Sequence, residues 1–598
     1  MKKKFLWILV SCLMVLSLVI ASCGQGEEEE AKVTEEGGQV ITTKEKEEVE
    51  VEEEEVAEGP EVPQYGGTLN MMQGMDIQGF DHALYTRGFL NNVYLVNDTM
   101  VVGDWSRGEA GTGEIDWAMS SQKRIDYTVG QLAESFEILE PSKIVFHVRH
   151  GVHFSLGLDF EASRLVNGRE MTGDDVAFSL DRHIHSPMSY LAITDPTMPK
   201  NTTVTQTDPW TVVVETGLFN LDPLWLMLGE REIWPKEVIE KYGDVNDWRN
   251  QVGNGPFMMT DFVLGSSAIF TRNNNYWQKD PVGAGKGNQL PYVDSVRILV
   301  ITDTSSQQAA LRTGKIELLS GLSHDNYAEL MKTSPQLQFR KYIQGPNAIS
   351  MRLDKPDLPF NDIRVRQALM MAIDYEEIIE SYFNGEAEIL AWPLANIKGY
   401  DKAYMPLDQM PQSVQALYTY NPEQAKKLLA EAGYPDGFKT QIITTSAYTD
   451  YLSIYENMWA EVGVELNLQL VETGPYFNYT TTRQYPEMLY GFFVQPGPYA
   501  QLLPFRIDNT FNRSWVNDER VNETYAEILK YNLKDQAKVD QLHRDLMPYV
   551  LEQAWYIPTP GPYLYNFWQP WLKNYHGEGL IGYQPAWVRY VWIDQNLK

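Results

Sequence analysis

The residues that could carry chemistry in this 598-residue chain form neither a common hydrolase motif nor a zinc-protease motif, although a pair of carboxylates for acid/base catalysis cannot be recognised from spacing alone. Neither G-x-S-x-G nor H-E-x-x-H occurs, so there is no sign of a nucleophile elbow or of a zinc-protease helix. His147, His150 and His153 are spaced by three in FHVRHGVHF, and residues three apart on a strand point to opposite faces. We therefore expect these histidines to bind no metal.

The stretch VGAGKGN around Lys286 faintly resembles a phosphate-binding loop. Such a loop needs Ser or Thr after its lysine to bind Mg²⁺, and here Gly287 follows. Asp280 also occupies the place of the first glycine, which the tight turn requires. We expect a surface loop at this position, and we expect no catalytic residue, no metal and no cofactor in the protein.

Aromatic residues are unusually frequent: 16 Trp, 34 Tyr and 22 Phe make up 12% of the chain. Most of them must lie in the core, because aromatic side chains bury a large area. Trp392, Phe493 and Tyr499 instead stand in loop sequence rich in Gly and Pro, in LAWPLAN and YGFFVQPGPY. Loop aromatics of this kind line clefts, so these residues are candidates for a ligand site.

The two cysteines are both near the N-terminus, at Cys12 and Cys23. Three lysines and then an apolar run from Phe5 to Ile20 have the pattern of an export signal. The alternative is a permanent membrane anchor, but the run is short for a membrane span. The small residues just before Cys23 resemble the bacterial lipobox, in which the signal is cut before a cysteine that is then lipidated. We expect a signal peptide over 1–22 and a lipid anchor on Cys23.

The segment after the signal, 23–63, reads as an acidic tether. Between Glu27 and Glu61 it has sixteen Glu against three Lys and no aromatic residue, so it cannot bury enough apolar area to fold. The whole chain carries −32, and the part from Gln64 onward about −22, which argues against nucleic-acid binding. The sequence predicts an exported protein that is held at the membrane by its N-terminus.

From Gln64 onward the pattern is mixed α/β. GGTLNMM and the run from Lys143 to Val152 are typical of strands, as are TQIITTS and VELNLQLVE further on. Thr172 and Asp175 form a capping-box pattern before MTGDDVAFSLDRH, and FNDIRVRQALMMAID has helical apolar spacing. Asn421 is the expected N-cap of a further helix that ends near Gly433. About 535 residues are too many for one core, so we expect at least two lobes.

Six stretches, in order along the chain, resemble the peptide-type extracellular solute-binding proteins of ABC importers. This family, family 5, includes dipeptide-, oligopeptide- and nickel-binding members. The stretches are YGGTL, FHVRHGVHF with NGREMTGDDVAFSLDRH, NGPFMMTDFVLGSSAIFTRNNNYW, ITDTSSQQAALRTGKIEL, PFNDIRVRQALMMAIDYEEII and YNPEQAKKLLAEAGYPDGF. Together they span essentially all of the part that is expected to fold.

The resemblance implies an α/β, two-lobed periplasmic-binding-protein-like fold with a hinge and an extra N-terminal subdomain, of the family 5 or cluster C type. Lobe I would comprise 64–110, 246–345 and 555–598, the inserted subdomain 111–245, and lobe II 346–554. Such a protein traps its ligand between the lobes and hands it to a membrane permease that a separate ATPase powers. Closure would be favoured by the extra contacts that the ligand makes in the closed form.

Peptide binders of this family usually carry an aspartate that pairs with the ligand's free amine. The corresponding stretch here, LYGFFVQPGPYAQLL, has no acid between Leu489 and Leu503, although Asp508 lies nearby. A buried ammonium without a carboxylate would be costly, so ordinary peptide binding is in doubt. We expect stacking by aromatic residues and a hydrogen bond from Gln495; the expected ligand-binding residues are Trp392, Phe493, Gln495, Tyr499 and Trp515.

The sequence therefore predicts a monomeric, lipid-anchored substrate-binding component of an ABC importer for a peptide or another small organic solute. An oligosaccharide is one such solute, since aromatic platforms suit sugar rings. Two alternatives stay open: a ligand-sensing or chaperone-like binding lipoprotein without an import role, and a secreted hydrolase. A hydrolase would turn a substrate over, whereas a binding protein would show only saturable binding with closure.

Overall fold

The computed structural model describes residues 61–598, apart from 85–91, 119–123, 141, 190–191, 193–196, 218–220, 222–223, 226–227, 229–230, 346, 492–499, 508 and 583. The predicted signal peptide, Cys23 and nearly all of the predicted tether lie outside the described residues. No helix of the described part is long and apolar enough to span a membrane.

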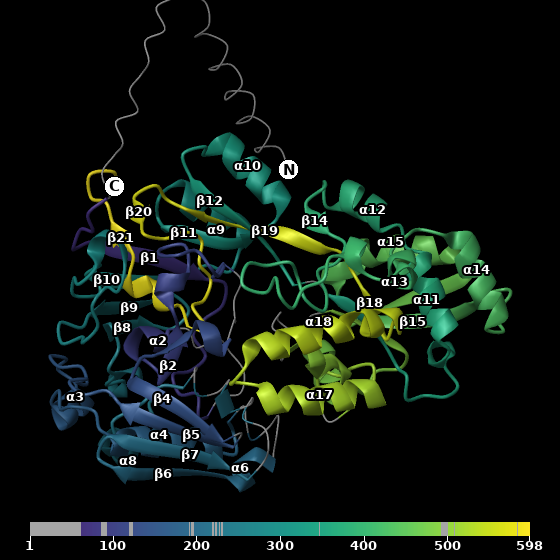
Figure 1. Cartoon of the computed structure of the whole chain (residues 1–598). Coiled ribbons are helices and arrows are strands. Elements are labelled where there is room, and N and C mark those ends of the chain that lie inside the picture. Colours follow the sequence, from purple (N-terminus) through teal and green to yellow (C-terminus); the bar gives the residue numbers. More distant parts are fainter. Residues whose placement is uncertain are drawn as a thin grey trace, which may run out of the picture. The chain divides into compact units, whose positions relative to one another are not determined.

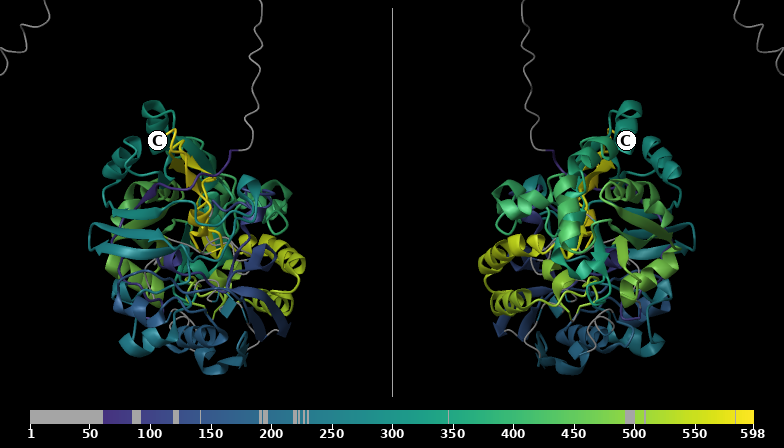
Figure 2. Two further views of the ribbon diagram at one scale, coloured as in Figure 1. Left: turned by 90° about the vertical axis from the view of Figure 1, so that its left-hand side faces the viewer. Right: turned by 90° about the vertical axis from the view of Figure 1, so that its right-hand side faces the viewer.

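The chain from Thr68 builds a four-stranded sheet whose strands come from distant segments. β1 (Thr68–Gln73) pairs in parallel with β10 (Ser295–Val300), and the antiparallel β9 (Ser267–Arg272) and β8 (Phe257–Val263) follow. The GGTLNMM prediction is confirmed by β1. The C-terminus lies close to the first described residues, where Gln595 Nε2 donates to the Tyr65 carbonyl at 3.4 Å (Figures 1 and 2).

A second four-stranded sheet is wholly antiparallel and consists of β4 (Ala133–Glu140), β5 (Lys143–Val148), β7 (Thr211–Thr216) and β6 (Thr202–Asp208). Ile144, Phe146 and Val148 alternate into the core, as the pattern predicts. The strand ends four residues before the predicted Val152, and a turn at His150 and Gly151 follows, where Gly151 has a φ of +74°.

The predicted helix beside this second sheet is α4 (Gly173–His185). The capping box forms as expected: the Thr172 side chain accepts from the backbone of Asp175, and the Asp175 carboxylate accepts from the N–H of Thr172. A two-stranded ribbon of β2 (Val101–Gly103) and β3 (Thr128–Gly130) also belongs to this half of the molecule.

A five-stranded mixed sheet organises the second half in the order β16 (Val464–Leu470), β15 (Phe438–Thr444), β17 (Met488–Gly491), β13 (Ala348–Met351) and β18 (Tyr556–Pro558). β15 is parallel to both β16 and β17. The predicted helices are α11 (Ile363–Met371) and α14 (Pro422–Glu431), and the Asn421 side chain caps α14 by accepting from the Gln424 N–H. Three more helices, α15 (Thr449–Ala460), α17 (Glu519–Tyr531) and α18 (Gln536–Glu552), complete this half (Figure 1).

The two halves are joined by two connections that run side by side. In the hinge sheet, β19 (Gly561–Trp568) lies between β11 (Leu318–Leu322) and β12 (Gln338–Ile343), with β14 (Ala387–Glu388) paired at its start. β12 continues into β13 and β18 continues into β19. Gln344 N–H donates to the Pro562 carbonyl at 3.0 Å, and Thr559 N–H to the Asn347 carbonyl at 3.2 Å. Such a short paired connection is suited to act as a hinge.

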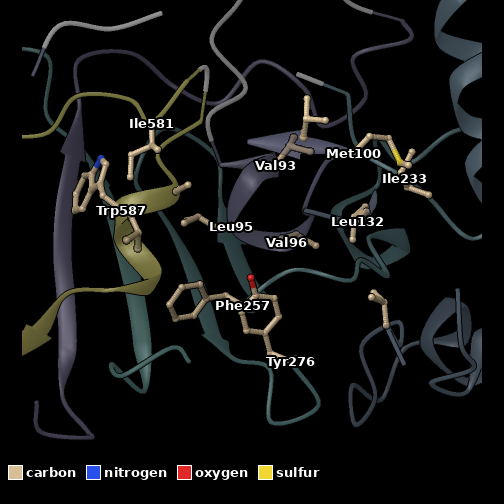
Figure 3. Packing of buried hydrophobic residues seen from close by; sticks show 14 of the residues in the cluster. Val93, Leu95, Val96, Met100, Leu132, Ile233, Phe257, Tyr276, Ile581 and Trp587 are labelled. Carbon is tan, nitrogen blue, oxygen red and sulfur yellow. The ribbon is translucent and has the colours of Figure 1, made fainter. Parts of the chain in front are cut away.

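Each half has its own hydrophobic core. The first core contains, among others, Leu69, Val96, Phe146, Phe257 and Trp587, several of which Figure 3 shows from close by. The second core contains Val365, Leu369, Tyr455 and Trp459. A smaller cluster around Leu311 and Phe567 packs against the hinge sheet. The boundaries that the sequence predicts for the two lobes and the inserted subdomain stay a prediction.

The remaining helices and strands are short or peripheral. They are α2 (Val93–Val96), α3 (Glu161–Val166), α6 (Thr197–Asn201), α8 (Lys236–Tyr242), α9 (Thr304–Arg312), α10 (His324–Thr333), α12 (Tyr375–Glu377), α13 (Gln412–Leu417), α16 (Thr473–Thr482), β20 (Leu572–Lys573) and β21 (Trp592–Ile593).

Candidate functional site

The predicted ligand-binding segment begins where the central strand of the five-stranded sheet ends. β17 ends at Gly491, and Phe493, Gln495 and Tyr499 follow in 492–499, outside the described residues. Gly491 pairs with Ala348, the first residue of β13, and Ala348 pairs with Pro558 at the end of β18. The segment therefore starts beside both hinge connections, at the carboxyl ends of parallel strands, where α/β sheets bind ligands.

Gly491 is held in a conformation that suits only glycine. Its φ is +142°, and a Cβ atom there would lie 1.7 Å from the Tyr476 hydroxyl oxygen. The Tyr476 hydroxyl donates to the Tyr490 carbonyl at 3.1 Å. Tyr476, in α16, thus fixes the direction in which the chain leaves β17.

A wall of tyrosines lies beside the end of β17. The ring of Tyr448, which follows β15, meets the ring of Tyr490 edge-on with centroids 5.1 Å apart. Asn347 Nδ2 donates to the Tyr490 hydroxyl at 3.5 Å, and the Thr559 hydroxyl donates to the Asn347 carbonyl at 2.8 Å. Burial raises the pKa of Tyr490 well above its usual value, so its hydroxyl stays neutral. Tyr490 is 3% exposed, and it therefore shapes this strand end more than it offers surface to a ligand.

Sequence reasoning missed these residues. Tyr448, Tyr476 and Tyr490 are ordinary core-type aromatics in the sequence, and Asn347 and Thr559 belong to segments about 210 residues apart. The one available signal was that Tyr490 directly precedes GFFVQPGPY. The meeting of the two hinge connections at this strand end could not be inferred from spacing.

Trp392 is packed into the second core rather than displayed in a cleft. It is 3% exposed, and its ring lies 5.5 Å from that of Phe505 and 5.2 Å from that of Tyr556. It also lines an apolar cavity of about 10 Å³ with Met410 and Met547, which leaves room for about one water molecule. In this arrangement Trp392 offers little surface to a ligand, and its role in binding stays a prediction.

Two guanidinium groups lie close to the ring of Trp515. Arg483 is 4.1 Å from the ring centroid and Arg352 is 5.4 Å from it, while Asp354 accepts two hydrogen bonds of 2.6 Å from Arg352. The Trp515 indole N–H is buried and has no hydrogen-bond partner within the part of the chain that is described. Since Ser514 N–H donates to the Tyr556 hydroxyl at 3.1 Å, Tyr556 connects the surroundings of Trp515 with those of Trp392.

The stretches that faintly suggested other chemistry have local partners. His147 Nε2 lies 3.0 Å from Glu137 Oε1, the ring of His150 lies against that of Trp210, and His153 Nδ1 donates to the Gly168 carbonyl. Lys286 is exposed and follows a single turn, Gly283–Gly285. No group of three or more His, Cys, Asp or Glu within the described ranges could hold a metal ion.

Comparison with known proteins places the chain among binding proteins. Residues 128–512 match the model of bacterial extracellular solute-binding proteins, family 5 middle. The chain is 26% identical over 474 residues to heme-binding protein A of Haemophilus influenzae, which covers 74% of this chain and 81% of the relative. It is 24% identical over 456 residues to the glutathione-binding protein GsiB of Salmonella typhimurium, with 71% and 79% covered.

A solved structure bears out the fold. The periplasmic binding protein DppA of Helicobacter pylori, in complex with the peptide STSA, superposes with a TM-score of 0.67 at 22% identity, covering 89% of this chain and 99% of that one. The predicted periplasmic-binding-protein fold is therefore confirmed, and the proteins that share it and the family are binding proteins rather than enzymes. This chain belongs to family 5 of the bacterial extracellular solute-binding proteins.

Proposed function

We propose that this protein is the lipid-anchored substrate-binding component of an ABC importer. It captures a peptide or another small organic solute between two lobes and delivers it to a membrane permease. The observation that carries the proposal is the meeting of the hinge connections with the end of β17, where Gly491, Ala348 and Pro558 are neighbours. A ligand bound at this point contacts the segment 492–499 and is placed to stabilise the closed arrangement of the hinge.

The chemistry of this strand end favours a ligand that does not depend on a free amine. Tyr490 at this strand end is neutral, and the sequence supplies Gln495 where peptide binders of the family usually carry an acid. An oligosaccharide, or a peptide without a free amino terminus, would use stacking on Phe493 and Tyr499 and a hydrogen bond from Gln495. Its buried polar groups would then need no carboxylate partner.

The test is a thermal-shift screen of the full chain against di- to pentapeptides, oligosaccharides and Ni²⁺. A cognate organic solute raises Tm, and the rise grows with the logarithm of its concentration. If only Ni²⁺ raised Tm, the organic-solute proposal would be wrong. If peptides with free amino termini bound tightly, the inference from Gln495 would fail.

Two variants locate the site once a ligand is found. Phe493→Ala and Gln495→Ala should each weaken binding about tenfold, as truncation of a central contact does. Leu264→Ala, at an exposed residue in the turn after β8, is the control and should leave the affinity unchanged. Equal loss in all three variants would place the ligand elsewhere.

The anchor is tested separately by cell fractionation. Cys23→Ala should move the protein from the membrane fraction to the soluble fraction, since lipidation needs the thiol and an anchored protein depends on its acyl chains. Cys12→Ala is the matched control, because Cys12 lies inside the predicted signal and is removed with it. A Cys23→Ala protein that stayed with the membrane would contradict the lipid anchor.

A further inference from the structure

The helical hairpin of α17 and α18 belongs to the second core but reaches the first. Val521, Ile528 and Val539 on these helices lie in the second core. Leu533, in the turn between the two helices, is 7% exposed and belongs to the first core. In Figure 1 the left-hand ends of both helices point toward the first half of the molecule. The turn of the hairpin is therefore an apolar contact between the two halves, away from the hinge connections.

A buried ion pair lies near this turn. Arg124, which precedes β3, has one carboxylate partner on its own segment: it donates from Nε and Nη2 to Asp126 at 3.0 and 2.8 Å. Its Nη2 also donates to Asp540 Oδ2 at 3.0 Å, and its Nη1 donates to the Gly399 carbonyl at 2.7 Å. The side chains of Arg124 and Asp540 are 4% and 1% exposed. Arg124 and β3 belong to the first half, whereas α18 and Gly399 belong to the second. The pair thus connects the halves through charges that water does not reach.

Neighbouring residues from both halves contact the Arg124–Asp540 pair. The guanidinium of Arg124 lies over the rings of Tyr127 and Tyr400, 5.0 and 5.2 Å from their centroids. Gln536 Nε2 donates to Asp540 Oδ1 at 2.9 Å, which supports the carboxylate from its own helix. Gly399 has a φ of +93°, and a Cβ atom there would lie 3.2 Å from Ile115 Cγ1 and 3.3 Å from the Tyr127 ring, so glycine leaves room for these side chains of the first half.

We propose that the Arg124–Asp540 pair and Leu533 form a latch that holds the two halves together in the closed form. This proposal rests on the proposed function, since a binding protein of this kind opens and closes about its hinge. Opening has to separate the contacts that lie away from the hinge. It exposes the apolar side chain of Leu533 to water. It also takes from Asp540 its only cationic partner among the described residues, whereas Arg124 keeps Asp126. The latch therefore raises the fraction of molecules that are closed before any ligand binds. A ligand then needs a smaller difference in affinity between the closed and the open form to complete the closure.

The test is hydrogen exchange, followed by mass spectrometry, on the full chain without ligand. Asp540→Asn removes the negative charge and keeps the size of the side chain. We expect exchange at the amides of 124–127 and 397–400 to become about tenfold faster, because these segments are exposed more often. Asp545→Asn is the matched control: it makes the same change on the exposed face of the same helix, where Gln541 is the partner, and should change neither segment.

A second variant tests the same contact with less risk of unfolding the protein. Lys398 is half-exposed and lies 3.6 Å from Glu109 across the same contact, so Lys398→Ser should speed exchange in both segments by about twofold without unfolding the protein. The latch is overturned if Asp540→Asn leaves both segments unchanged, or if it speeds exchange equally in α11 and β15, which would show loss of the second core. The readout uses no ligand, so a thermal-shift screen without hits would count against the proposed function and leave the latch standing.

Discussion

The two cores bury polar groups in different ways. The first core contains the carboxylates of Asp81, Asp98 and Glu232, all fully buried. Each has a cationic or imidazole partner: Arg182 at 2.7 Å, Arg589 at 2.7 Å and His82 at 2.8 Å, respectively. The second core is richer in buried tyrosines, among them Tyr375, Tyr418, Tyr451, Tyr455 and Tyr490. The first core also buries Tyr276, Tyr292, Tyr575 and Tyr590, and the second half also buries the carboxylate of Asp540.

The difference follows from what each group costs to bury. A carboxylate keeps its charge only if a partner offsets the loss of water, so its energy depends on that one partner. A tyrosine stays neutral, because burial raises the pKa of Tyr375 and Tyr455 well above the usual value. The first core should therefore be sensitive to the loss of single charges, and the second core should tolerate the loss of single hydroxyls.

Acid should lower the free energy of unfolding more than any single substitution, because each half buries a histidine in its neutral form. Burial lowers the pKa of His183 from 6.5 to about 4 and that of His543 from 6.5 to about 3. The Glu232 carboxylate near His183 offsets part of this, whereas neither ring nitrogen of His543 has a hydrogen-bond partner among the described residues. Because the folded pKa is lowered, the stability is present above pH 6.5 and is lost as the pH falls through the folded pKa.

The loss should be on the order of 5 kcal/mol for His543 by pH 3, measured by urea unfolding at a series of pH values. His543→Leu should flatten the decline between pH 6.5 and 3, while His185→Leu, an exposed histidine on α4, should leave it unchanged. Coinciding pH profiles for the wild type and His543→Leu would mean that His543 is not buried in its neutral form.

Removing a partner in the first core should have the next largest effect. Arg589→Met leaves Asp98 buried without its charge partner, and should lower the free energy of unfolding by about 4 kcal/mol in urea at pH 7. Arg249→Met breaks an exposed pair with Asp247 and should cost at most about 0.5 kcal/mol. If the two variants were equally stable, the stability of the first core would not depend on its buried ion pairs.

The smallest effects should come from two tyrosines of the second core. Tyr455→Phe removes a hydrogen bond of 2.9 Å with the Tyr451 hydroxyl, and should lower the free energy of unfolding by about 1 kcal/mol. Tyr418→Phe removes a buried hydroxyl that has no partner within the described part of the chain, and should be neutral or slightly stabilising. Thermal unfolding of both variants measures the difference, and a larger loss for Tyr418→Phe would reverse the expected order.

Local features were predicted well, because neighbouring residues decide them. The capping box of Thr172 and Asp175, the cap by Asn421 and the alternation in KIVFHV all depend on side chains a few residues from the backbone groups that they serve. The family was also predictable, since its motifs are contiguous stretches. Burial was harder: Trp392 stands in loop sequence next to a proline, yet the fold covers it with Phe505 and Tyr556.

The sequence by itself determined the helix starts, the strand pattern and the family; the export signal stays a prediction. Only the tertiary structure decided that Asp98 would meet Arg589, 491 residues away, and that β1 would lie beside β10. It alone brought Gly491 to the two hinge connections and Arg124 to Asp540. The reason is physical: a cap or a strand pattern is set by short-range geometry, whereas partners hundreds of residues apart are chosen by chain topology and by the burial of both cores together.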